Sequence, residues 1–136
     1  MHEATLRDFF TGAATADALR DDLVGTAEQI MPRATRHHVV SLEGEFTVTG
    51  QHVVRLCDAV LAGSLQPEDL ATIGFCMVAS DYFHWDDKTS DGFWVGETLH
   101  DWSSPEINYP LTKDTVRLFR ERLITGKDVL KNTQTA

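Results

Sequence analysis

One aspartate and two histidines are the residues of this chain best suited to chemistry. Asp81 and His84 are spaced so that a helix would carry a carboxylate and an imidazole on neighbouring turns, and His100 could join them. Such a trio is a conceivable metal or acid–base site. Helical spacing alone supplies only two ligands, however, and the chain has no HExxH, cysteine-cluster or EF-hand pattern. We therefore expect no metal. A small helical metal- or ligand-binding protein, an enzyme included, is the alternative function.

Nucleophilic catalysis and nucleotide chemistry have less support in the sequence. Ser64, Ser80 and Ser103 all lie outside any nucleophile-elbow pattern. Gly92 and Gly96 are isolated, so the chain has no glycine-rich loop of the kind that holds a phosphate. We therefore expect a protein without catalytic residues and without a cofactor.

Aromatic and acidic residues are concentrated in residues 81–109. This block holds all three Trp, both Tyr and two of the seven Phe, together with seven acids and one base, Lys88. Rigid rings supply contact area at protein–protein interfaces, and surrounding charges speed encounter and select the partner. The simpler interpretation is that most of these rings belong to the core and the acids only solvate a loop.

The net charge of −9 is unevenly distributed along the chain. Residues 57–112 carry ten acids and one base, whereas the segment from residue 113 onward carries three acids and six bases. A negative field of this kind repels nucleic acid and anionic membranes and attracts a basic surface. We expect a basic protein partner, with no nucleic acid and no membrane bound.

Apolar spacing and capping residues predict a mostly helical chain. Helices are expected at residues 4–10, after Thr15, from Thr49 to Gly63, at 70–83, at 93–102 and from Thr112 to Gly126. Residues 86–92 are expected to form a turn, and alternation about Glu43-Gly44 favours a small β-hairpin at residues 36–49, or an extended loop. The prediction is an all-α fold: one domain over residues 1–136, a bundle of about five to six helices.

Two further features bear on the compartment. The longest apolar run, residues 73–79, is far too short to span a bilayer, and the first ten residues lack the pattern of a signal peptide. Cys57 and Cys76 fall within helix-like apolar patterns and are expected to be buried free thiols. These features favour a cytoplasmic protein.

Two segments resemble a known family. LRDFFTGAATADALRDDL is similar to the opening of bacterial self-protective immunity proteins of the colicin D type. PEDLATIGFCMVASDYFHWDD, followed by an acidic turn and FWVGETLHDW, is similar to a later part of that family. The resemblance implies an acidic helical protein that binds a basic ribonuclease domain, covers its active site and imitates the charge of RNA.

The resulting hypothesis is a non-catalytic, immunity-like inhibitor that neutralises a basic toxin, foremost a nuclease. A structural subunit that dimerises through the aromatic block is a third possibility. Trp85 and Tyr109 are the expected anchors, whereas Trp94 and Trp102 are expected to be more buried. The expected partner-binding residues are Asp81, His84, Trp85, Asp86, Asp87, Asp91, Asp101, Glu106 and Tyr109.

Overall fold

In the computed structural model of this chain, threonines and glycines set several helix ends as the sequence predicted. Oγ1 of Thr15 and Oγ1 of Thr112 each accepts the backbone N–H three residues on, at 3.1 Å. This bond satisfies a donor that the first helical turn leaves unpaired. Gly12 and Gly126 end the first and last helices with φ values of 88° and 71°. This left-handed geometry favours glycine, which has no Cβ to clash.

The structure describes residues 2–24, 27–31, 34–37, 42–105 and 109–130, with side chains omitted for 27–31 and 34–37. The described part of the chain is mostly helical, which confirms the predicted fold class. Its helices are α1 (Glu3–Thr11), α2 (Ala16–Leu23), α3 (Gly50–Leu61), α4 (Asp69–Ala79), α5 (Ser90–Ser103) and α6 (Lys113–Thr125).

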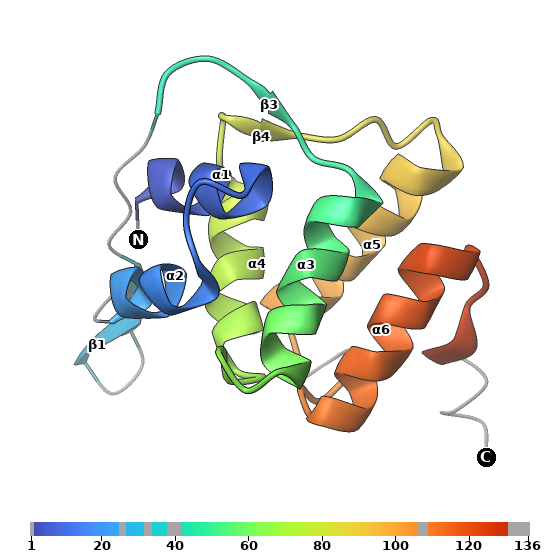
Figure 1. Cartoon of the computed structure of the whole chain (residues 1–136). Helices are drawn as coiled ribbons and strands as arrows, with labels where there is room; N and C mark the ends of the chain where they lie inside the picture. Colours follow the sequence, from blue (N-terminus) through green and yellow to red (C-terminus); the bar gives the residue numbers. More distant parts are fainter. Residues whose placement is uncertain (1, 25–26, 32–33, 38–41, 106–108, 131–136) are drawn as a thin grey trace.

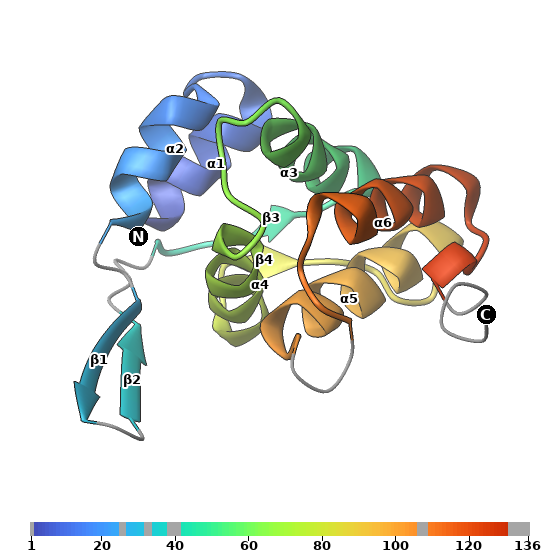
Figure 2. The ribbon, with the colours of Figure 1, turned by 90° about the horizontal axis from the view of Figure 1, so that it is seen from below.

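The helices pack in two layers. Helices α3 and α6 lie side by side in front of α5, and α1 and α2 cover the other flank of α3 (Figure 1). Seen from below, α4 and α5 form the second layer (Figure 2). The core between the layers is apolar and includes the fully buried Leu56, Ile73, Leu99 and Phe119. Burial of these side chains is the main force that holds the helices together.

Helices α4 and α5 approach closely at Gly74. A Cβ at this residue would lie 2.9 Å from Cβ of Trp102 and 3.0 Å from the carbonyl oxygen of Leu99. Any larger side chain would therefore push the two helices apart. The contact fixes the packing of α4 against α5, which carries Asp91 and Asp101 of the predicted site.

Two short β pairings accompany the helices, and they correct the predicted hairpin. β1 (Ala27–Met31) and β2 (Ala34–His37) form an antiparallel pair that projects from the helices (Figure 2). β3 (Phe46–Thr47) instead pairs in parallel with β4 (Phe83–His84). The antiparallel pair thus precedes most of residues 36–49, and the strand within that segment joins a distant part of the chain. Residues 38–41 lie outside the described residues.

The end of α4 also differs from prediction, because it ends at Ala79 and not near residue 83. Oγ of Ser80 accepts the N–H groups of Tyr82 and Phe83 and donates to the buried carboxylate of Glu3. The carbonyl of Tyr82 accepts the N–H of Phe46 at 2.7 Å. These contacts, some local and some with distant residues, keep residues 80–84 out of the helix, with bends at Asp81 and Tyr82 followed by β4.

Helix α5 begins earlier than predicted. Oγ1 of Thr89 accepts the N–H of Gly92 at 3.0 Å, so Asp91 and Gly92 belong to the first turn of the helix and not to a preceding turn.

Both cysteines are buried and free, as predicted, and burial raises the pKa of Cys76 to about 11. None of the described helices combines the length and the apolar character needed to cross a membrane.

Candidate partner-binding surface

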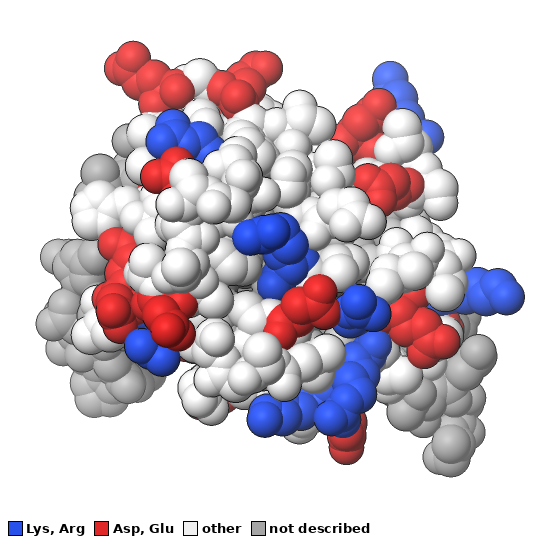
Figure 3. All heavy atoms as spheres, viewed as in Figure 1, with Lys and Arg blue, Asp and Glu red and all other residues white. Residues whose placement is uncertain are grey.

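Residues 81–89 run from the end of α4 to the start of α5, and we call them the acidic loop. Asp81, His84, Asp86 and Asp87 are exposed on it. Its path follows β4 and then the upper right of the molecule in Figure 1. Figure 3 shows acidic side chains along the upper edge of the same face with basic side chains among them, and a mixture of both signs over its middle and lower part. The structure thus brings four of the predicted residues together on one exposed segment.

Two glycines of α5 allow the acidic loop to lie directly on the helix. A Cβ at Gly96 would lie 2.7 Å from Nε1 of Trp85, and a Cβ at Gly92 would clash with the backbone of Asp86. Because these glycines are four residues apart, they form one flat stripe on the helix surface. The loop therefore has close backbone and ring contacts along one face of α5.

Hydrogen bonds within the acidic loop fix its turn. The carbonyl of Asp86 accepts both the N–H and the hydroxyl of Thr89, at 3.1 and 2.8 Å. The carboxylate of Asp86 accepts the N–H of Lys88 at 3.0 Å. Asp86 and Asp87 are consequently held in a hydrogen-bonded turn whose backbone packs on α5, whereas Asp81 lies outside this turn.

The predicted aromatic anchors are only partly accessible. Trp85 is half-buried and packs against the core. Tyr109 is also half-buried, with its ring edge-on to Phe119 at 5.9 Å, and burial raises the pKa of its hydroxyl. Trp102 is fully buried, as predicted, whereas Trp94 is half-buried like Trp85.

Two of the predicted acids have partners within the protein. The carboxylate of Asp101 accepts a hydrogen bond from the buried guanidinium of Arg122 at 2.9 Å. Burial raises the pKa of Asp101, and the hydrogen bond and charge of Arg122 offset this effect only in part. The carboxylate of Asp91 accepts the N–H of Gly50 at 3.0 Å, at the first residue of α3. Both acids therefore help to join helices, while Glu106 lies outside the described residues.

The residues of the alternative metal site lie on different kinds of structure. Asp81 lies in a bend after α4 and His84 in β4, so the helical spacing assumed for them does not apply. His100 is in the last turn of α5. Among the described residues, no group of three or more His, Cys, Asp or Glu side chains is placed to hold a metal ion.

Phe93 is an exposed aromatic residue that the sequence did not single out. It retains 43% exposure and meets Trp94 edge-on at 4.9 Å. Once α5 is known to begin at Ser90, the pattern is readable: Val95, Leu99 and Trp102 face inward, so Phe93 and Glu97 share the outward face. A sequence prediction that started the helix after a Thr89 cap would have placed Phe93 on its exposed face.

Comparison of this chain with known protein families, with curated proteins and with solved structures found no match.

Proposed function

We propose that this protein is an acidic, non-catalytic inhibitor that binds a basic protein partner through the acidic loop and the adjoining outward face of α5. The proposed partner is a basic toxin domain, foremost a ribonuclease, in the cytoplasm of the bacterium that makes both proteins. In this proposal the carboxylates of Asp81, Asp86 and Asp87 occupy sites on the partner that otherwise hold RNA phosphates.

The observation that carries the proposal is the combination of exposure and order in the acidic loop. Asp81, Asp86 and Asp87 are exposed, while Trp85 and the backbone of Asp86 are packed on the glycine stripe of α5. A preorganised surface loses little conformational entropy on binding, so more of the contact energy contributes to affinity. Ordered carboxylates also fix the register of a basic partner.

Phe93 gives the proposed surface an apolar anchor. Its ring is held against Trp94 and lies two residues after Asp91, in the helix that carries the loop. Binding energy at interfaces concentrates in a few large side chains surrounded by polar residues. We assign the anchor role to Phe93, with half-buried Trp85 as its support beneath the loop.

The direct experiment uses the product of the neighbouring gene as the candidate partner. The two purified proteins are mixed, and calorimetry measures the dissociation constant for the wild type and for the double variant Asp86→Lys with Asp87→Lys. We expect the double variant to bind far more weakly, because two attractive charges become repulsive. The variant also loses the hydrogen bond from the N–H of Lys88 to the carboxylate of Asp86, so its free energy of unfolding should fall by about 1 kcal/mol, and thermal unfolding checks that the fold is retained.

A matched control makes the same charge change elsewhere. Asp17 and Asp21 are exposed on α2, with side chains 66% and 76% accessible, and α2 lies on the opposite flank of the molecule (Figure 1). The double change Asp17→Lys with Asp21→Lys should leave affinity nearly unchanged. Equal loss in both double variants would mean that net charge alone drives binding. If the loop variant still binds tightly, the acidic loop is not part of the interface.

A further inference from the structure

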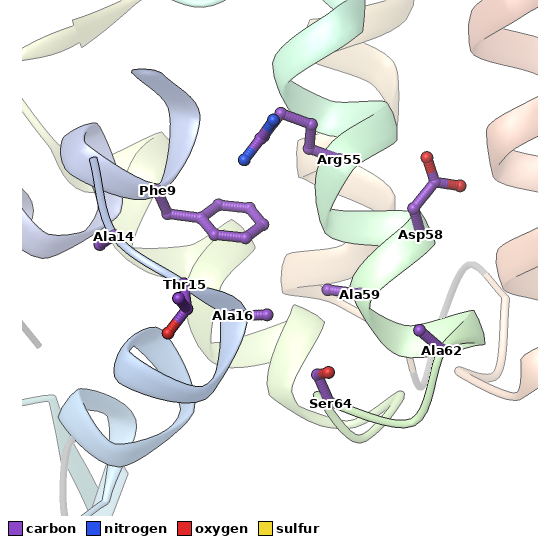
Figure 4. A pocket seen from close by; sticks show the side chains of 9 residues that line it. All are labelled: Phe9, Ala14, Thr15, Ala16, Arg55, Asp58, Ala59, Ala62 and Ser64. Carbon is purple, nitrogen blue, oxygen red and sulfur yellow. The ribbon is translucent and has the colours of Figure 1, made fainter. Parts of the chain in front are cut away.

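A groove separates the α1–α2 region from α3, on a different part of the surface from the acidic loop. Its volume is about 360 Å³, and its apolar lining comes from Phe9, Ala16, Ala59 and Ala62. Figure 4 shows the ring of Phe9 and the methyl groups of Ala16 and Ala59 projecting toward this space from opposite sides. Small side chains on both walls therefore leave room that larger residues would fill.

A cation at the rim of the groove has no carboxylate partner among the described residues. The guanidinium carbon of Arg55 lies 5.1 Å from the ring centroid of Phe9, and Arg55 forms no ion pair in the described part of the chain. Stacking on an aromatic face restrains the long side chain and leaves its N–H edge available. Arg55 is thus an ordered donor in a protein whose net charge is −9.

The carboxylate of the groove lining is already engaged. Asp58 accepts a hydrogen bond from Nε of Arg120 on α6 at 2.6 Å, and Figure 4 shows its carboxylate pointing away from Phe9 and Ala16. Because Asp58 is paired with Arg120, Arg55 is the charged residue of the lining that has no ion-pair partner among the described residues.

We propose that this groove binds a small monocarboxylate with an apolar body, such as an aryl or branched aliphatic acid. The carboxylate accepts two hydrogen bonds from the fork of Arg55, and the apolar body contacts Phe9, Ala16 and Ala59. Arginine presents paired donors that match a carboxylate, and such charge-assisted bonds are stronger than neutral ones. The groove volume is at the small end of the range for ligand pockets, roughly 300–1,000 Å³, which selects a small acid.

This site is independent of the proposed interface with a basic partner. Arg55 would repel a basic surface, and the groove lies between α1–α2 and α3, away from the acidic loop. Failure of the groove to bind an acid would leave the inhibitor proposal intact, and the reverse also holds.

The test is a titration of the full chain with sodium phenylacetate at constant ionic strength, followed by NMR. The resonances observed are the methyl groups of Ala16, Ala59 and Ala62 and the Nε–H group of Arg55. We expect saturable shifts at these groups, with a dissociation constant on the order of a millimolar for so few ligand atoms. Phenylacetamide lacks the charge and acetate lacks the ring, so each should bind at least about fivefold more weakly.

Three variants separate this site from general attraction of anions. Arg55→Gln removes the charge from an exposed side chain and should weaken phenylacetate binding about fivefold to tenfold. Ala62→Leu fills the groove from an exposed residue in ordinary helical geometry and should weaken binding similarly. Arg117→Gln, at a 62% exposed arginine on α6 outside the groove, should leave binding unchanged.

Three results would overturn the proposal. One is the absence of saturable shifts at the groove residues. Another is equal affinity for phenylacetate and phenylacetamide, which would show that Arg55 recognises no carboxylate. The third is an equal loss of affinity in Arg55→Gln and Arg117→Gln, which would show that binding depends on the net charge of the protein and not on the groove. Thermal unfolding of each variant confirms that the fold is retained.

Discussion

The guanidinium of Arg122 is buried against the ring of Trp94, with its central carbon 4.9 Å from the ring centroid. The same group donates to the hydroxyl of Thr98 at 3.0 Å and to the carboxylate of Asp101 at 2.9 Å. A second ring, that of Phe119, lies 5.3 Å from it. One charged side chain of α6 is thereby surrounded by residues of α5, so the two helices depend on each other at this point.

Removal of Arg122 should destabilise the protein strongly. The side chain is 3% exposed and its partner Asp101 is 13% exposed, so Arg122→Met leaves a mostly buried carboxylate without its cation. We expect a loss of about 3 kcal/mol in the free energy of unfolding, at the lower end of the range for broken buried pairs. Urea denaturation checks the value.

The double variant Asp101→Asn with Arg122→Met tests the origin of that loss. The double variant has no buried carboxylate that lacks its cation. Its loss in the free energy of unfolding should therefore be smaller than the sum of the losses in the two single variants. Strict additivity would mean that Arg122 acts through its contacts with the rings and not through Asp101.

His52 should make stability depend on pH. Its ring lies 5.1 Å from the rings of both Phe10 and Phe46, and its Nδ1 accepts the N–H of Thr49 at 3.0 Å. Burial, and then the charge of Arg55, lower the pKa of His52. The folded state therefore binds a proton less readily than the unfolded chain. This contribution to stability is complete above the unfolded pKa of about 6.5 and is lost as pH falls toward the folded pKa.

The variant His52→Gln isolates this effect. Glutamine can still accept the N–H of Thr49 in a capping box, but it does not titrate. We expect the wild type to lose more stability than His52→Gln between about pH 7.5 and pH 5, measured as the shift in urea midpoint. His100→Gln, at an exposed histidine, is the control and should follow the wild type. Parallel curves for all three proteins would contradict the assignment.

Phe93 and Phe75 offer a matched test of the interface. Both retain 43% exposure, but Phe93 is on α5 next to the acidic loop and Phe75 is on α4. Phe93→Ala should weaken binding of the basic partner by about 2–4 kcal/mol, as expected for an anchor, while Phe75→Ala should change it little. Calorimetry with each variant gives the comparison. Equal effects would place the anchor elsewhere.

Trp85→Ala should behave differently from Phe93→Ala. Because Trp85 is half-buried and packs on Gly96, its truncation should lower both the unfolding temperature and the affinity for the partner. Loss of affinity without loss of stability would make Trp85 a contact residue, as the sequence suggested.

Association with the basic partner should be fast and sensitive to salt. The Debye length falls from about 10 Å at 0.1 M to about 3 Å at 1 M salt, so charge steering by the acidic loop weakens as ions are added. Stopped-flow measurement of the association rate against ionic strength checks this expectation. A rate that does not change with salt would exclude electrostatic steering.

Local chemistry in the sequence was enough to predict the helices and several of their caps, though not the end of α4 or the start of α5. Thr15, Thr49 and Thr112 precede α2, α3 and α6, and Gly12 and Gly126 follow α1 and α6, because capping depends on residues only a few places apart. The excess of negative charge in the middle of the chain was also readable, since charge is a property of composition.

Only the tertiary structure decided which of the acids and rings are available to a partner. Asp101 is engaged because Arg122 lies beside it in space, and Asp91 because the first N–H of α3 points at its carboxylate from 41 residues away. Residues 80–84 are not helical because Ser80 donates a hydrogen bond to Glu3 and the carbonyl of Tyr82 accepts one from Phe46, and these bonds end the helix that local propensity favoured. Such contacts join residues far apart in sequence, and hydrogen bonds of this kind override local preference because unpaired polar groups are costly to bury.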